Sequence, residues 1–186
     1  MKALLWRNDA RVWRWCRQNT LISNDAHQRW LDRIERDPSI KMFGIAVNDE
    51  RVGVCGLTSI SPINQSAEFS LYIAPEHQGN GHGKKALLVL LRHGFLDLNL
   101  NRIWGESFDG NPAKKTFLEI GMRSEGVLRE TYFRQGRFID SEIFSMLRSE
   151  YVDRYDLGGA VPFESPDGGD SVLAPGVSPG DTTAPR

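Results

Sequence analysis

The chain has 186 residues, 40% of them hydrophobic and 25% charged, which is typical of one globular domain with a sizeable core. Lysine and arginine number 23 against 24 for aspartate and glutamate, so no basic excess favours nucleic acid as a partner. The two cysteines have no metal-ligand or redox spacing, no apolar run approaches the ~20 residues of a membrane span, and the N-terminus lacks a signal-peptide pattern. We therefore expect a cytoplasmic protein that binds no metal, no nucleic acid and no membrane.

The first third of the chain predicts helices followed by a β-hairpin. Apolar residues recur near helical spacing over residues 2–18, in one short helix or in two broken near residues 8 and 9. Ser23 can cap the next helix, which Pro38 ends. Residues 41–47 and 51–60 alternate like two strands joined by a tight turn.

The centre of the chain predicts a strand, a glycine-rich loop and a helix. The strand at 69–73 leads to Gly79, Gly81 and Gly83 and then to an apolar helix that begins near Lys84. Glycines tolerate positive φ, so the N–H groups of such a loop can turn onto a phosphate, and the helix N-terminus adds positive charge. The G-x-G-x-G spacing is neither that of the NTPase phosphate loop nor that of the dinucleotide fingerprint. We therefore predict an anion cradle of another kind.

The remaining residues predict a strand, a helix, a second hairpin and a tail. Residues 102–108 form a strand parallel to the one before the glycine loop, because a helix intervenes. Pro112 opens a helix that Gly121 ends, and residues 125–147 form a hairpin that turns near residue 135. Six Gly and five Pro fall in the last 30 residues, which also carry four acids against one arginine. We expect a folded domain at 1–156 and a disordered acidic tail at 157–186.

The loop sequence QGNGHG resembles the Q/R-x-x-G-x-G/A signature with which the GNAT superfamily of N-acetyltransferases holds the diphosphate of acetyl-CoA. All three fixed positions match, at Gln78, Gly81 and Gly83. The order of elements is also similar to the GNAT fold over most of residues 4–150. The resemblance implies an α/β (α+β) fold with a mixed central sheet flanked by helices, and acetyl-CoA as co-substrate with no metal.

The resemblance also implies which residues bind acetyl-CoA. The backbone of the strand would face the pantetheine arm, the loop would hold the diphosphate, and two residues near the next helix would assist. In that order these residues are Leu71, Tyr72 and Ile73, then Gln78, Gly79, Asn80, Gly81, His82, Gly83 and Lys84, then Asn111 and Lys114. The alternatives are core packing for the strand, loop solvation for His82, N-capping for Asn111 and plain exposure for Lys114.

For catalysis, the resemblance implies that Glu68 is the general base. A carboxylate inside an apolar strand is costly unless it is used or paired, although strand alternation could also point Glu68 to solvent or into a salt bridge. The family's usual acid, a tyrosine, falls at Phe117, which cannot donate a proton. Tyr132 is the nearest substitute by region and is equally plausible as a strand aromatic. His27 and Trp30 are candidates for the acceptor pocket, with a surface position or core packing as alternatives.

We therefore expect an acetyl-CoA-dependent N-acetyltransferase acting on the primary amine of a small molecule, such as an amino-sugar nucleotide. Residues 68–72 are similar to the branch that modifies amino-sugar nucleotides, whereas residues 129–140 are more similar to the branch that acetylates protein N-termini. A protein N-terminus is the alternative acceptor. Phe117 keeps open a non-catalytic acyl-CoA-binding module, and the acidic tail keeps open an interaction protein. Members of the family usually open with a β-strand before these helices, and here only a few residues precede Trp6. We therefore also expect a poorly protected sheet edge and a possible homodimer.

Overall fold

The computed structural model describes residues 2–18, 20–155 and 171–175. It opens with three helices, α1 (Lys2–Asn8), α2 (Ala10–Trp13) and α3 (Asn24–Arg36), as expected. The first predicted helix is broken in two because Asp9 caps α2 with its carboxylate, which accepts from the Arg11 amide at 2.8 Å. Ser23 caps α3 as predicted, since its hydroxyl accepts from the Ala26 amide at 3.2 Å. None of the described helices is long and apolar enough to cross a membrane.

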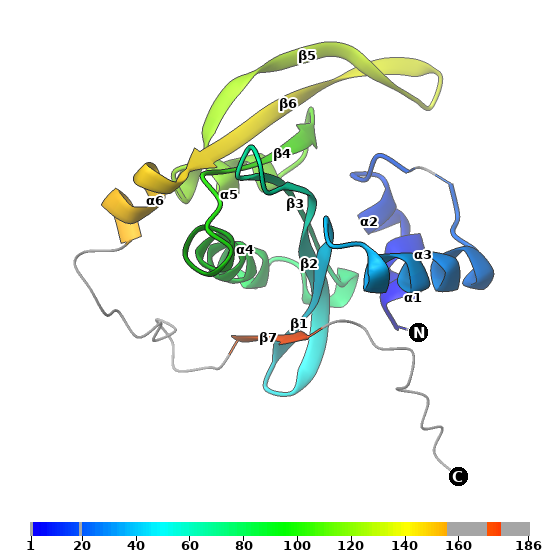
Figure 1. The fold of residues 1–186 in the computed structure, drawn as a ribbon. Helices are drawn as coiled ribbons and strands as arrows, with labels where there is room; N and C mark the ends of the chain where they lie inside the picture. Colours follow the sequence, from blue (N-terminus) through cyan, green and yellow to red (C-terminus); the bar gives the residue numbers. More distant parts are fainter. Residues whose placement is uncertain (1, 19, 156–170, 176–186) are drawn as a thin grey trace.

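The strands form one mixed sheet, which confirms the predicted architecture. They are β1 (Lys41–Val47), β2 (Glu50–Ser61), β3 (Ser66–Ile73), β4 (Arg102–Phe108), β5 (Arg123–Arg134), β6 (Arg137–Leu147) and β7 (Ser171–Pro175). Their order is β5-β6-β4-β3-β2-β1-β7, and β3 with β4 is the parallel pair among described strands. Figure 1 shows α4 (His82–Arg92) on one side of the sheet and α1–α3 on the other.

Tight turns close both predicted hairpins. Asn48 and Asp49 between β1 and β2 have φ of 48° and 63°, and Gln135 and Gly136 between β5 and β6 have φ of 48° and 80°. Two consecutive positive φ values suit the right-handed twist of the flanking strands, and Asn, Asp and Gly adopt them at least cost. The β5–β6 hairpin projects beyond the sheet as a long curved arm (Figure 1).

The parallel strands β3 and β4 part after three residue pairs. Their register runs from Ser66 opposite Arg102 to Glu68 opposite Trp104 and goes no further. The ring of Phe69 then lies across β4, where a Cβ on Gly105 would come within 2.3 Å of it. Glycine is required at this position, and the backbone pairing of the two strands ends at Glu68, beyond which they separate.

The core lies between the sheet and the helices that follow the glycine loop. The 3₁₀ turn η1 (Pro75–His77), the π-helical turn η2 (His93–Asp97) and α5 (Ala113–Glu119) connect these layers. From α4, Ala86, Leu87, Leu90 and Leu91 are buried against the sheet. A further helix, α6 (Arg148–Tyr155), was not predicted. Its buried Tyr151 packs on Phe95 with 5.4 Å between ring centroids, a distant contact that the sequence does not reveal.

The expected disordered tail is wrong at residues 171–175. These residues form β7, which pairs antiparallel with β1 from Val47 opposite Ser171 to Phe43 opposite Pro175. The unpaired edge of β1 supplies backbone hydrogen bonds that composition does not reveal, and β7 covers the edge expected to be poorly protected. The other residues of the predicted tail lie outside the described part of the chain.

Candidate active site

The glycine loop enters α4 through backbone conformations that glycine favours. Gly79 and Gly81 have φ of 82° and 77°, in the left-handed region. Gly81 is the N-cap of α4 and has no side chain with which to bond the first amides of the helix. Gln78 fixes the loop to the end of β3, because its side-chain amide donates to the Ile73 carbonyl at 3.1 Å. The start of α4 therefore offers backbone donors that suit an anion.

Gly83 links this loop to the strand expected to face the pantetheine arm. A Cβ at Gly83 would lie 3.6 Å from side-chain atoms of Leu71 and Ile73, which is ordinary contact. Packing within the chain therefore does not require glycine here, whereas close approach of a ligand backbone or phosphate would. The structure brings the predicted diphosphate loop and the predicted strand side by side.

The cationic residues predicted beside the cofactor are engaged in ion pairs. Lys84 Nζ lies 3.1 Å from Glu119 Oε2, and Lys114 Nζ lies 2.8 Å from Glu142 Oε2. His82 has its ring 6.5 Å from that of His77. Partial burial lowers the pKa of His82, and the charges of His77 and Lys85 lower it further. The neutral form of His82 is thus favoured in the loop.

Two predicted cofactor residues have local structural roles. Asn111 Oδ1 accepts from the amide of Ala113, the first residue of α5, at 3.0 Å, so its side chain bonds the backbone where the helix begins. Tyr72 is turned toward α1, where its hydroxyl donates to the Ala3 carbonyl at 3.4 Å, and burial raises its pKa. A cofactor contact by Tyr72 would therefore use its backbone.

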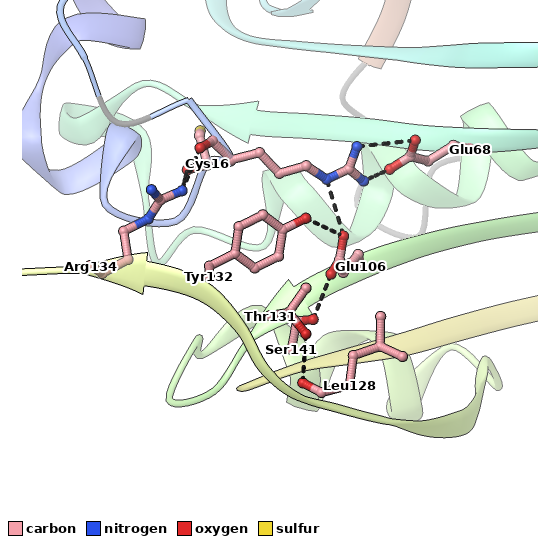
Figure 2. Close-up of polar contacts among 9 residues, drawn as sticks. Cys16, Glu68, Glu106, Leu128, Thr131, Tyr132, Arg134 and Ser141 are labelled. Atoms are coloured by element: carbon pink, nitrogen blue, oxygen red, sulfur yellow. Dashed lines mark hydrogen bonds and ion pairs between the residues drawn. The ribbon is translucent and has the colours of Figure 1, made fainter. Parts of the chain in front are cut away.

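Glu68 is buried and paired, which is one of the alternatives anticipated for it. The residue is 8% exposed, and both carboxylate oxygens bind the guanidinium of Arg17. The Nη1 to Oε2 distance is 3.3 Å. Arg17 comes from the segment after α2, and its Nε also donates to Glu106 Oε2 at 3.1 Å (Figure 2). One guanidinium thus joins carboxylates from β3 and β4 where the two strands separate.

Glu106 is a central residue that sequence reasoning missed. It accepts from Tyr132 Oη at 2.8 Å and from Ser141 Oγ at 2.5 Å, in addition to Arg17 (Figure 2). Burial raises the pKa of Tyr132, and the bond to Glu106 raises it further. The sequence shows only that Glu106 follows Trp104 by two residues, whereas the structure shows that Trp104 pairs with Glu68. Strand alternation places Glu106 on the face of Trp104, and the pairing of Trp104 with Glu68, which the folded sheet provides, places both carboxylates on one face.

Arg134 holds the segment that carries Arg17. Its Nη2 donates to the Cys16 carbonyl at 3.1 Å and, more closely, to the Arg17 carbonyl. Its guanidinium lies 5.3 Å and 5.6 Å from the ring centroids of Phe108 and Tyr132. The end of the β5–β6 hairpin is thereby fastened to the loop between α2 and α3.

Phe117, where the family pattern has its tyrosine, is a core residue. It is 7% exposed, and its ring centroid lies 5.2 Å from that of Phe69 and 5.5 Å from that of Phe144. His27 and Trp30 stack on each other on α3 at 5.7 Å, and burial lowers the pKa of His27. Within the described residues, neither of them joins the hydrogen bonds around Glu68.

The described residues also hold no group of three or more His, Cys, Asp or Glu side chains placed to bind a metal ion. The arrangement is instead that of a sheet with two parted parallel strands, a glycine loop at a helix start and a buried carboxylate at the point of parting. This arrangement of strands, loop and helix is that of the GNAT fold. Residues 1–123 match the family model described as the acetyltransferase (GNAT) domain, and the chain belongs to this family.

Two curated relatives and one crystal structure show which members of the family the chain is similar to. The chain is 38% identical over 104 residues to the spermidine N(1)-acetyltransferase of Vibrio cholerae, covering 55% of this chain and 60% of that protein. It is 30% identical over 108 residues to the ribosomal-protein-serine acetyltransferase of Escherichia coli, covering 58% and 60%. The crystal structure of the Vibrio cholerae spermidine enzyme with CoA and spermine matches with a TM-score of 0.76 and 28% identity, over 80% of this chain and 89% of that one. The sequence alignments thus span about three fifths of these two curated relatives.

Proposed function

We propose that this chain is an acetyl-CoA-dependent N-acetyltransferase whose acceptor is the primary amine of a small cationic molecule. The observation that carries the proposal is the position of Glu68, buried where β3 and β4 part and on the strand that leads into the glycine loop. Polyamines are the first acceptor class to test. Similarity to spermidine acetyltransferases supports this choice, and so do two carboxylates from adjacent strands that can recognise ammonium groups.

An amino-sugar nucleotide, the acceptor first expected, gains no such support. Its diphosphate is anionic, and the polar cluster at the parted strands brings Glu68 and Glu106 against one arginine. The relatives described above are named for spermidine and for ribosomal protein. We therefore propose a cationic amine, rather than an amino-sugar nucleotide, as the acceptor.

Acetyl-CoA would bring a thioester to the site, and the chain's own residues would bind and orient it. The amides between Gly79 and Lys84 would donate to the diphosphate. The edge of β3 beyond Glu68, which has no ladder partner on β4, would pair with the amide groups of the pantetheine arm. Asn111 and Lys114 remain predicted contacts of the same ligand.

Glu68 would take a proton from the acceptor's ammonium group and leave a neutral amine able to react. Tyr132 is the proposed proton donor to the departing thiolate, because its hydroxyl lies in the same hydrogen-bonded cluster through Glu106. His27 and Trp30 are proposed to line the acceptor's path.

The ribosomal-protein relative favours a second candidate, transfer to a protein N-terminus. Release of free thiol from acetyl-CoA, measured with spermidine, propylamine, an amino-sugar nucleotide and a serine-initiated peptide in turn, decides between the candidates. We expect the largest kcat/KM with spermidine. A larger kcat/KM with the peptide would instead support a protein N-terminus as the acceptor. Calorimetric binding of acetyl-CoA without thiol release from any amine would instead identify a non-catalytic module.

A further inference from the structure

We propose that Arg17 is a resident cation that occupies the place of the acceptor's ammonium group against Glu68, and that the acceptor must displace it to react. The inference rests on the proposed function, because it concerns the same site. It assigns a gating role to a residue that the family signature does not include.

The two carboxylates differ in what they would lose if Arg17 left. Within the described residues, Arg17 supplies every hydrogen bond and ion pair to the Glu68 carboxylate. Glu106 would retain donors from Tyr132 and Ser141. Departure of Arg17 would therefore leave one buried carboxylate, Glu68, in need of a new cationic donor. An ammonium group is such a donor.

The paired state also opposes the proposed chemistry. A carboxylate whose two oxygens each accept from a guanidinium has one lone pair on each oxygen already engaged by a charged donor, which makes it a weaker acceptor for a substrate's proton. Arginine does not give up its own proton in proteins. For Glu68 to act as a base, the acceptor's ammonium must first replace Arg17. One N–H bond of that ammonium then breaks and one O–H bond forms on Glu68, which leaves a neutral amine and a neutral carboxyl group. Arg17 keeps its charge, and Glu106 keeps its donors from Tyr132 and Ser141.

The position of Arg17 permits this exchange without unfolding an element. Its side chain is 48% exposed, against 11% for Glu68 and 8% for Glu106, so the guanidinium reaches the buried acids from solvent. Residues 14–17 form turns and bends between α2 and α3 rather than a helix or strand. Arg134 holds the backbone carbonyls of Cys16 and Arg17, not the guanidinium. The side chain can therefore move while its anchor stays in place.

While Arg17 occupies Glu68, the acceptor cannot bind there. The apparent affinity for the acceptor is therefore the intrinsic affinity multiplied by the fraction of time that the site is open. Arg17→Gln should therefore lower KM for spermidine and for propylamine by about tenfold, if the closed state is favoured about ten to one, with kcat changed less than about twofold. Arg17→Lys keeps a competing cation and should fall between the wild type and Arg17→Gln. Arg14→Gln is the matched control, because Arg14 lies on the same segment and its side chain, among the described residues, donates to the Ala10 carbonyl and not to the Glu68 cluster.

Binding and turnover together separate this inference from the proposed function. Calorimetry with spermidine measures affinity even where no thiol is released, and circular dichroism checks that each variant is folded. Tighter spermidine binding in Arg17→Gln, with Arg14→Gln unchanged, supports the gate. Unchanged or weaker binding in a folded Arg17→Gln overturns it, whatever the turnover. Should Arg17→Gln fail to fold, the Arg17→Lys affinity decides, and equality with the wild type overturns the gate. Absence of thiol release in every form, with tighter binding in Arg17→Gln, overturns the proposed function alone.

Discussion

Glu68 is the last residue of β3 that still pairs with β4, and its carboxylate is buried at the point where these strands part. Removing a carboxylate from water is costly, and Arg17 offsets that cost in the structure described. The proposed base is therefore stabilised in its buried position by Arg17, and the same contact blocks it. Both properties come from a single contact between residues 51 positions apart.

Glu68→Gln should lower kcat by about 10²-fold or more while leaving acetyl-CoA affinity unchanged, because the amide keeps the shape but cannot accept a proton. Steady-state kinetics and calorimetry measure the two quantities. Glu35→Gln, an exposed change on α3, is the control. Equal turnover in the wild type and Glu68→Gln would remove Glu68 from the mechanism.

Gly83→Glu should weaken acetyl-CoA binding by more than about tenfold, because it places a negative charge where the diphosphate is expected. The fold should persist, since φ at Gly83 is not positive and a Cβ there meets only ordinary contacts at 3.6 Å. An acidic side chain also suits the first turn of a helix. Gly83→Ala is the control for bulk without charge. Unchanged affinity in Gly83→Glu would argue against the cradle.

At the scale of elements, the sequence predicted the features that depend on residues close together in the chain. The Ser23 cap, the turn residues Asn48 and Asp49, and the helix stop at Gly121, where φ is 90°, all occur where the sequence indicated them. Arg17 and Glu106 were not predicted as site residues. Their partners lie 51 and 26 residues away, on elements that only the folded sheet brings together. The cofactor loop was therefore visible from sequence, whereas the polar cluster was not.

The contact between α5 and β6 predicts a dependence of stability on pH. Lys114 bonds Glu142 and holds the pKa of that carboxyl below its usual value, with help from the Ser124 hydroxyl. A lowered folded-state pKa means that the stabilisation is present above the unfolded value, near 4.5, and is lost as pH falls through the folded value.

Glu142→Gln should therefore melt a few degrees below the wild type at pH 7, since a partly exposed pair contributes at most about 1 kcal/mol. The gap should narrow as pH falls below about 4.5, where the wild-type carboxylate also becomes protonated. Thermal midpoints of both forms between pH 7 and pH 3 measure it. A gap of constant size across that range would contradict the assignment.

At the scale of the whole molecule, the sheet is completed by a strand from far along the chain. β7 lies at the edge of the sheet beside β1, opposite the end that carries the β5–β6 hairpin. Composition predicted no structure for this segment, because the last 30 residues as a whole are rich in Gly and Pro, whereas residues 171–175 contain no Gly and form a five-residue backbone ladder. Covering an edge strand also prevents it from pairing with other chains.

A chain truncated after Tyr155 should keep acetyl-CoA affinity but lose thermal stability, because the β1 edge is then unpaired. We also expect it to self-associate as concentration rises. Sedimentation velocity and thermal melting of the truncated and full-length chains measure these effects. Equal melting and equal sedimentation of the two forms would show that β7 contributes nothing to the sheet.

The central claim is that the loop between Gln78 and Lys84 holds a diphosphate and that this aims a thioester at the opening beside Glu68. A crystal structure with coenzyme A bound tests it most directly. The account predicts diphosphate oxygens about 3 Å from backbone amides at the start of α4, and the sulfur between β3 and β4 on the side of Glu68. A diphosphate bound elsewhere, or a sulfur outside that opening, would contradict it.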